Sequence, residues 1–382
     1  MTAANMLLAN ASPLRTSRRD LDALRPIIRQ WLAANVTNTN NIDDISVTAP
    51  TSAGVANETL MVSTVMAGRP GPGYVFRLQG EEHLYPGADI AHHARICDRI
   101  SQCSKVPVPR IHGVEDNPDI LGSRFMVMEW VRGRVPPDVP NFHRAGWLKA
   151  LPPARREAIW RDCIAQMARL HAMDPANFQF LHESGEAKDD GPYQGRSGLS
   201  SALKYWDVFA RWCSGDELPI IAAARYWLWA KLPKDEPGGF AWGDARLPNV
   251  IVRGDRCVAI LDWDMASLAG PEADLAWWAL ADHKHTLTLG VPRLPGIGSP
   301  AETIRLWESL SGRSVRNMDW YLVYTAYSHA LISYRLFRLN NGADVSIADF
   351  MAAPGISVQW LASLIGYSLP MRLTMPFSGL EL

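Results

Sequence analysis

The first third of the chain changes from a helical to a strand-like pattern of apolar residues. Residues 18–35 carry apolar side chains on one helical stripe, and an Asn-rich polar segment at 36–45 follows them. Beyond it, short apolar runs are separated by turns that contain Gly or Pro. These runs are residues 45–49, 59–66 and 74–79. The pattern predicts one amphipathic helix and then an antiparallel meander.

A second helix is predicted over residues 88–102, before two further extended runs at 106–114 and 125–131. The segment 131–140 is rich in Pro and Gly, which indicates a connection between two lobes. We therefore expect three parts along the chain. They are an N-terminal helical extension (residues 1–40), an N-lobe with a small sheet (41–130) and a C-lobe (131–382).

Helical spacing dominates the C-lobe sequence. Helices are expected at residues 156–174, 200–213, 217–231 and 319–338, with an exposed polar loop at 183–198. One strand pair is indicated at residues 250–263, where Gly254 and Asp255 separate two apolar runs as in a β-hairpin. The expected fold class is α+β, with a small antiparallel-sheet N-lobe and a larger, mainly helical C-lobe.

Three polar residues stand at the ends of this hairpin. Asp244 precedes it, Asn249 begins its first strand and Asp262 follows its second strand, so folding brings the three together. A hard cation such as Mg²⁺ prefers carboxylate and amide oxygens, which Asn249 and Asp262 supply. Asp244 would then accept a proton from an attacking hydroxyl, as in phosphoryl transfer to an alcohol. Each Asp alone is equally explained as a turn residue that caps its own backbone.

A series of motifs, in the same order along the chain, resembles the aminoglycoside phosphotransferase and choline kinase-like family of small-molecule kinases, relatives of the protein kinases. WGDARLPN (242–249) resembles the catalytic loop of that family, ILDWD (260–264) its metal-binding segment and GPEADLAWW (270–278) the signature that follows. In the N-lobe, residues 51–62 resemble the nucleotide-covering loop and 74–79 the strand with the phosphate-pairing cation. The resemblance implies a two-lobed, protein-kinase-like fold that uses ATP and Mg²⁺.

The resemblance also implies roles for individual residues. Asp244 is the catalytic base or the group that orients the acceptor hydroxyl, Asn249 and Asp262 hold Mg²⁺, and Arg77 replaces the lysine that pairs the ATP phosphates. Asp274 braces the catalytic loop. The remaining nucleotide-binding residues are the hinge residues Glu129, Trp130 and Val131 for adenine, Val75 and Ile251 on either side of its ring, and Ser52 to Asn57 above the phosphates.

Two positions depart from the family pattern. Trp242 replaces the usual His before Gly-Asp, as in a WGDAR subgroup whose relatives include kinase domains that act on hydroxyacyl-CoA and are fused to acyl-CoA dehydrogenases. His93 stands where the helix at 88–102 normally supplies a Glu to the phosphate-binding cation, although Asp89 is an alternative partner. An Arg–His pair would be weaker than an Arg–carboxylate pair and would depend on pH.

Three further features have two interpretations each. Arg246 would contact the γ-phosphate or an anionic acceptor, or would pair with Asp264 or a neighbouring acid. Asp264 would add to the metal site through water, or would hold its loop. The segment His283–His285 does not have convincing metal spacing and is more typical of a solvated helix end.

Composition narrows the function classes. The 382 residues include 38 Lys and Arg against 39 Asp and Glu, a net charge of −1, so neither a nucleic-acid nor a membrane partner is indicated. We expect no membrane span, because no run of about 18 apolar residues occurs. The five cysteines are scattered and the N-terminus lacks the pattern of a signal peptide, which favours the cytoplasm. The oligomeric state is not indicated.

The sequence leaves the acceptor open. The 15 Trp serve core packing or an aromatic acceptor pocket, and the nine acids and eight Lys or Arg from residue 270 onward do not indicate a polycation site. The leading hypothesis is an ATP-dependent phosphotransferase acting on a hydroxyl of a small molecule, such as a hydroxyacyl-CoA. The alternatives are an aminoglycoside O-phosphotransferase and a weakly active nucleotide-binding regulator.

Overall fold

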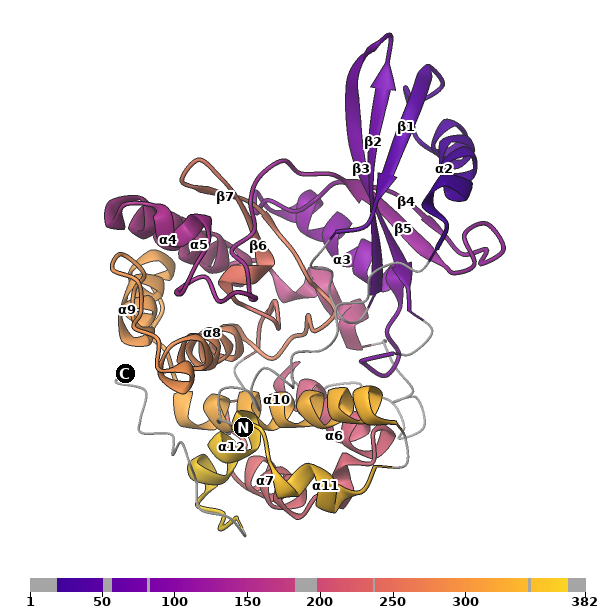
Figure 1. The fold of residues 1–382 in the computed structure, drawn as a ribbon. Helices are drawn as coiled ribbons and strands as arrows, with labels where there is room; N and C mark the ends of the chain where they lie inside the picture. Colours follow the sequence, from indigo (N-terminus) through magenta and orange to yellow (C-terminus); the bar gives the residue numbers. More distant parts are fainter. Residues whose placement is uncertain are drawn as a thin grey trace.

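The structure is a computed structural model that describes residues 19–50, 57–80, 83–182, 198–235, 238–342 and 345–369. A small sheet with two flanking helices forms one lobe, and helices with a single strand pair form the larger lobe (Figure 1). Among the described residues, no helix has both the length and the apolar character needed to cross a membrane.

The N-lobe contains an antiparallel five-stranded sheet in the order β1-β2-β3-β5-β4. The predicted meander is confirmed, but its central turn is shorter than expected. Ala67 and Gly68 alone make the turn, both at positive φ as in a tight β-hairpin, so β3 already begins at Arg69. The strands are β1 Ile42–Thr48, β2 Asn57–Met66, β3 Arg69–Gln79, β4 Ile111–Glu115 and β5 Phe125–Glu129.

Two helices, α2 (Leu21–Asn35) and α3 (Ile90–Cys103), pack against opposite faces of the sheet. Successive residues of a strand therefore contact different helices. On α2, Trp31 packs edge-on against Phe76 and Phe125. The next residue, Met126, instead clusters with Ile90 and Ala94 of α3, because successive strand residues point to opposite faces. Arg77 follows Phe76 on β3 and therefore points away from the α2 face, toward the α3 side.

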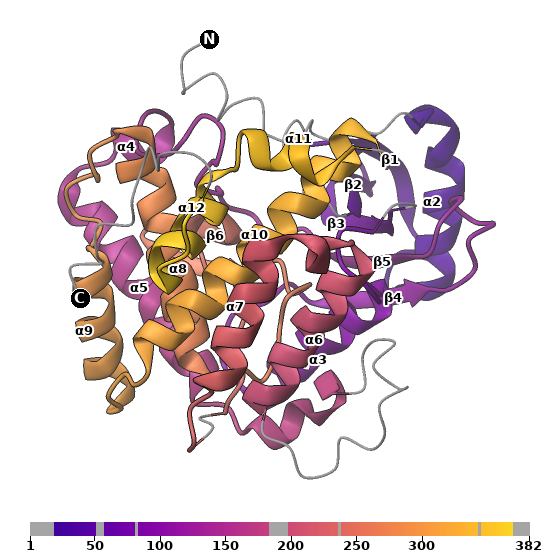
Figure 2. The same cartoon turned by 90° about the horizontal axis from the view of Figure 1, so that it is seen from below.

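The C-lobe helices gather around α10, which packs against α7, α8 and α12 (Figure 2). The expected helix at 156–174 begins earlier, at Pro153, because Pro is favoured in the first helical turn. The helices are α4 Trp147–Ala150, α5 Pro153–His171, α6 Gly198–Trp212, α7 Pro219–Ala230, α8 Pro271–His285, α9 Pro300–Ser311, α10 Met318–Asn341, α11 Ile347–Ala352 and α12 Ile356–Ile365.

The predicted hairpin is confirmed as β6 (Val250–Arg253) and β7 (Arg256–Ile260). It is tied to the connection between the lobes by two backbone hydrogen bonds between Arg134 and Val252, of 2.8 and 2.9 Å. Gly133 permits this approach, because a Cβ there would lie 2.4 Å from Cγ2 of Ile251. The hairpin therefore holds both of its ends, where the polar residues stand, close to the junction of the lobes.

Candidate active site

The catalytic loop is held from behind by Asp274 of α8. Its fully buried carboxylate accepts hydrogen bonds from the backbone N–H groups of Trp242 (2.7 Å) and Gly243 (2.8 Å). It also accepts one from Nε2 of His171, whose Nδ1 in turn accepts from Trp307. His171 is therefore the neutral tautomer with its proton on Nε2. The predicted bracing role of Asp274 is confirmed.

Trp242 joins the catalytic loop to the segment that follows β7. Its indole N–H donates to the carbonyl of Leu261 at 2.8 Å, and Leu261 N–H donates to the carbonyl of Asn249 at 2.9 Å. Gly243 lies so close to Met265 that a Cβ would stand 2.2 Å from the Met265 carbonyl oxygen, and its φ is +94°. A packed Trp thus fills the place of the usual His and fixes the two segments together.

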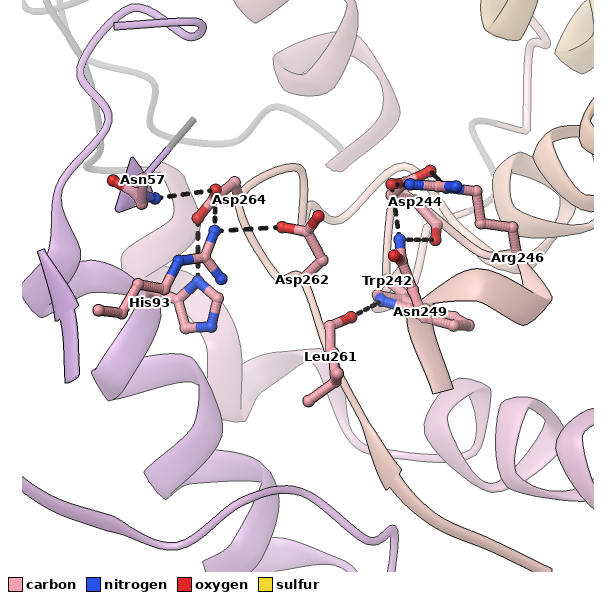
Figure 3. A network of polar contacts seen from close by, with 10 residues as sticks. Asn57, His93, Trp242, Asp244, Arg246, Asn249, Leu261, Asp262 and Asp264 are labelled. Carbon is pink, nitrogen blue, oxygen red and sulfur yellow. Dashed lines mark hydrogen bonds and ion pairs between the residues drawn. The ribbon is translucent and has the colours of Figure 1, made fainter. Parts of the chain in front are cut away.

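The carboxylate of Asp244 receives hydrogen bonds from three side chains. Nδ2 of Asn249 donates at 2.6 Å, Nε1 of Trp277 at 2.6 Å and Nε of Arg246 at 2.9 and 3.0 Å. Figure 3 shows Asp244, Arg246 and Asn249 grouped on one side of the site. These donors fix the orientation of the Asp244 carboxylate within the site.

Arg246 connects Asp244 to a second acid. Its Nη1 donates to Oδ2 of Asp138, and Oδ1 of Asp138 lies 3.1 Å from Nε2 of His285. Burial alone would raise the pKa of Asp138, but the Arg246 guanidinium and the His285 contact hold it below its usual range. Arg246 therefore pairs with the neighbouring acid Asp244 and with Asp138, as one of the two expected pairings foresaw, and not with Asp264.

The second acidic group is formed by the segment after β7. Nη2 of Arg77 lies 2.7 Å from Oδ2 of Asp264 and 3.4 Å from Oδ1 of Asp262. Nδ1 of His93 lies 2.9 Å from the other oxygen of Asp264, and Nδ2 of Asn57 donates to Asp264 at 3.4 Å. Figure 3 places Asp262 between this group and Asp244. Arg77 and His93 thus meet on Asp264.

The pKa values of the two acids move in opposite directions. Burial raises the pKa of Asp262, and the negative charges of Asp264 and Asp244 raise it further although Arg77 opposes them. For Asp264, burial acts in the same direction, but Arg77 and the His93 hydrogen bond outweigh it and lower the pKa. Asp262 is therefore the acid that a further cation would stabilise most.

The donor set suits Mg²⁺. Because Nδ2 of Asn249 is used by Asp244, its Oδ1 is the atom left to face a cation, and the Asp262 side chain is 35% exposed. An amide oxygen, a carboxylate and substrate phosphates are ligands that Mg²⁺ accepts. The described residues contain no cluster of three or more His, Cys, Asp or Glu side chains placed to hold a metal. The amide oxygen of Asn249 and the substrate phosphates would therefore complete the set of ligands.

The residues expected around adenine lie where the lobes join. Val75 is buried on β3 and Ile251 is half-buried on β6. The hinge N–H groups already have protein partners: Glu129 donates to Arg110, Trp130 to Gly73 and Val131 to the Glu129 carbonyl at 3.1 Å. A nucleotide that accepts a hydrogen bond from Val131 would have to replace this last bond. Ser52 lies outside the described residues.

Two further expectations are wrong. Asp89 does not serve as the partner of Arg77: it caps the N-terminus of α3 through the Ala91 N–H and lies 3.2 Å from Arg124. The C-terminal end of α8 was expected to be exposed to solvent, but the side chains of His283 and His285 are buried.

Sequence reasoning missed Asp138 and Trp277 as members of the site. Trp277 had a detectable signal, because it lies three residues after Asp274 on the same helix and so shares its face. Asp138 had none, since it lies in the irregular connection between the lobes, more than 100 residues before its partner Arg246.

The fold and the site together define a two-lobed, protein-kinase-like phosphotransferase. The sequence profile described as "Phosphotransferase enzyme family" matches residues 48–293. The chain belongs to this family and is an enzyme of the small-molecule kinase class, as its sequence predicted.

Solved structures share the fold. A Ralstonia eutropha protein assigned provisionally as an aminoglycoside phosphotransferase aligns with a TM-score of 0.59 and 21% identity, over 90% of this chain and 96% of that one. A thermostable mutant of aminoglycoside phosphotransferase APH(4)-Ia, in a ternary complex with ADP and hygromycin B, aligns at 0.51 and 15% identity over 90% and 99%. The predicted α+β, kinase-like fold is confirmed.

Curated relatives are longer proteins. The chain is 27% identical to acyl-CoA dehydrogenase family member 10 of Mus musculus, over 56% of this chain and 20% of the relative. It is 26% identical to family member 11 of Homo sapiens over 58% and 28%, and 24% identical to the Arabidopsis thaliana protein named probable acyl-CoA dehydrogenase IBR3 over 82% and 39%. The chain thus spans about a fifth to two fifths of their length.

Proposed function

We propose that this enzyme transfers the γ-phosphate of ATP to a hydroxyl of a small molecule with the help of Mg²⁺. The convergence of Asp244, Asn249 and Asp262 carries the proposal: one carboxylate is held by three donors while an amide oxygen and a second carboxylate stand beside it. This arrangement separates a proton acceptor from a set of metal ligands, as phosphoryl transfer to an alcohol requires.

Asp244 accepts the proton of the acceptor hydroxyl as its oxygen forms the bond to the γ-phosphorus. The bond between that phosphorus and the bridging oxygen breaks, and ADP leaves with the electron pair. Asn249 and Asp262 hold Mg²⁺, and Asp264 supports them. The metal, when bound, neutralises charge on the phosphates. Arg77 lies on the α3 side of β3 and donates to the phosphates from its place beside the two acids.

Arg246 positions Asp244 and adds positive charge near the transferred group. Glu129, Trp130 and Val131 bind adenine through their backbone, and Val75 and Ile251 contact its ring. Ser52 and Asn57 cover the phosphates, while His93 holds Asp264 in place. We further propose that the enzyme works in a reducing cytoplasm, because its five cysteines are all described and none forms a disulfide.

The acceptor we favour is a hydroxyacyl-CoA or another hydroxylated metabolite rather than an aminoglycoside. The relation to acyl-CoA dehydrogenase family members 10 and 11 supports a hydroxyacyl-CoA as the acceptor. The ion pairs of the site acids argue against an aminoglycoside, which is a polycation. Asp244 and Asp138 share Arg246, while Asp264 and Asp262 share Arg77, so the site acids already have cationic partners.

The deciding experiment is an ADP-release assay with the full chain, ATP and Mg²⁺ across hydroxyacyl-CoA thioesters, hydroxy acids, choline-like alcohols and aminoglycosides. Release that depends on one acceptor class and on Mg²⁺ supports the proposal and identifies the class. ATP binding without release for any acceptor favours a nucleotide-binding regulator. No ATP binding at all overturns the proposal.

A further inference from the structure

A pocket of about 110 Å³ lies beside the metal-binding segment, bounded by α3, by the loop that precedes it, by α6 and by residues 263–268. Asp264 lines the pocket, whereas Asp244 does not. The pocket is therefore adjacent to the reacting groups but separate from the cradle that holds the catalytic carboxylate.

Asp264 links the pocket to the reaction centre. It lines the pocket, and it follows Asp262 by two residues in the segment after β7. Tyr85 lines the same pocket, and burial together with the nearby negative charges of Asp244, Asp262 and Asp264 raises its pKa well above the usual value. A molecule in the pocket therefore lies beside the segment that would hold the metal.

Two buried polar groups of the pocket lining have no protein partner among the described residues. They are the indole N–H of Trp263 and the hydroxyl of Ser201. The side chains of Tyr85 and Tyr205 line the same pocket and add two hydroxyls to it. Buried polar groups are nearly always satisfied, so the two unsatisfied groups at one cavity indicate a missing ligand.

The pocket offers no unpaired charge. Its lining contains no Lys or Arg within the described part of the chain, and burial lowers the pKa of His92, which leaves this side chain neutral near pH 7. Its two carboxylates are already paired, Asp264 with Arg77 and Asp89 with Arg124. A polycation or a strong anion would therefore find no counter-charge there.

The remaining lining combines small and aliphatic side chains with several aromatic rings. Tyr85, Tyr205 and Trp263 are joined there by Trp206 and Tyr324, which bond each other at 3.0 Å and so keep their polar atoms occupied. Aromatic walls with a few convergent hydrogen-bonding groups are typical of small-molecule sites. Trp263 can only donate a hydrogen bond, which requires an acceptor atom on the ligand.

We propose that this pocket binds the non-reacting part of the acceptor, and that this part is uncharged, with an apolar or aromatic body and at least one oxygen that accepts a hydrogen bond from Trp263. The inference rests on the proposed function for the identity of the molecule as an acceptor. The chemical class of the bound part follows from the pocket lining itself.

A matched pair of probes tests the class. We would titrate 4-phenylcyclohexanol and its amine analogue 4-phenylcyclohexylamine into the full chain with ADP and Mg²⁺, and follow the indole N–H resonance of Trp263 by NMR, assigned with Trp263→Phe. The alcohol should shift this resonance and the amine should bind at least about tenfold more weakly. Equal or tighter binding of the amine, or no shift with either probe, overturns the proposal.

Three variants locate the binding. Tyr205→Phe, which keeps the ring, should weaken binding of the alcohol about three- to tenfold, the effect expected for one lost hydrogen bond. Ser201→Leu should weaken it more, because it fills the cavity. Tyr226→Phe, on an α7 side chain that is 78% exposed, should change nothing. Unchanged binding in both pocket variants would overturn the assignment.

The outcomes separate this inference from the proposed function. ADP affinity, measured by calorimetry on the same variants, should stay unchanged, since neither Ser201 nor Tyr205 is assigned to the nucleotide. Binding of the alcohol in the pocket without phosphotransfer to any acceptor would refute the proposed kinase activity and leave the ligand class supported. Phosphotransfer that proceeds unchanged in Ser201→Leu and Tyr205→Phe would keep the kinase and refute the pocket.

Discussion

The indole N–H of Trp277 donates a hydrogen bond of 2.6 Å to Oδ1 of Asp244. Three residues earlier on the same helix, Asp274 holds the backbone of the catalytic loop through Trp242 and Gly243. One helix, α8, therefore fixes both the path of the loop and the orientation of its carboxylate. Such positioning of a proton acceptor contributes to catalysis because it removes the need for the group to be oriented during the reaction.

Replacing Trp277 by Phe should lower kcat about threefold to tenfold, the effect expected for loss of one orienting hydrogen bond. The KM for ATP should stay unchanged, since Trp277 contacts no residue assigned to the nucleotide. Steady-state kinetics of ADP release measure both. Trp278→Phe is the matched control, because this neighbour is equally buried and has no contact with Asp244. An equal loss in both variants would mean that packing alone matters.

Asp244→Ala should lower kcat by at least about a hundredfold, because a general base contributes on this scale. The free energy of unfolding should also fall, since the buried donors of Asn249 and Trp277 lose their acceptor while Arg246 keeps Asp138 as a partner. Single-turnover transfer from γ-labelled ATP, with calorimetric ATP binding on the same sample, measures the effect. Turnover close to that of the wild type would remove Asp244 from the mechanism.

Periodicity predicted the elements and their order, but not the contacts between distant segments. The hairpin at 250–263 was predictable because Gly254-Asp255 sits between two apolar runs, and it alone brings Asn249 near Asp262. The position of His93 opposite Asp264, 171 residues later, depends on how the lobes pack and has no local signal. The same holds for the contact between Arg246 and Asp138.

The hydrogen bond of Trp242 to Leu261 should be measurable as stability. Trp242→Phe leaves the Leu261 carbonyl without this donor, which should lower the free energy of unfolding by about 1–3 kcal/mol beyond the loss of packing. Trp263→Phe is the control, because its ring lies 6.0 Å away and its indole N–H has no partner among the described residues. Urea unfolding compares the two. Equal losses would exclude a specific role for the hydrogen bond.

Stability should fall in acid partly through Asp138. Its pKa in the folded protein is held below the usual 3.8 by Arg246 and His285, so its contribution is present above about pH 4 and is lost as the pH falls through the lower folded value. Asp138→Asn should therefore be less stable than the wild type at pH 6. The difference should shrink below pH 4, as followed by thermal unfolding at several pH values. A difference that does not depend on pH would show that the charge of Asp138 is not involved.

For the variant His93→Glu, the contacts in this structure and the pattern of the family predict opposite changes in ATP affinity. By resemblance alone, a Glu at this position would restore the usual partner of the phosphate-binding cation and should raise ATP affinity. The structure predicts the opposite, because Nδ1 of His93 lies 2.9 Å from Asp264, and a second carboxylate there would repel it.

We expect His93→Glu to weaken ATP binding about tenfold and to lower the melting temperature, with both losses reduced in the double variant His93→Glu/Asp264→Asn. His93→Gln, which keeps a donor for Asp264 without adding charge, should bind ATP nearly as well as the wild type. Calorimetry with ATP and Mg²⁺ gives the affinities. Tighter ATP binding by His93→Glu would mean that Arg77 leaves Asp264 for the new carboxylate, and that the family pairing can form here after all.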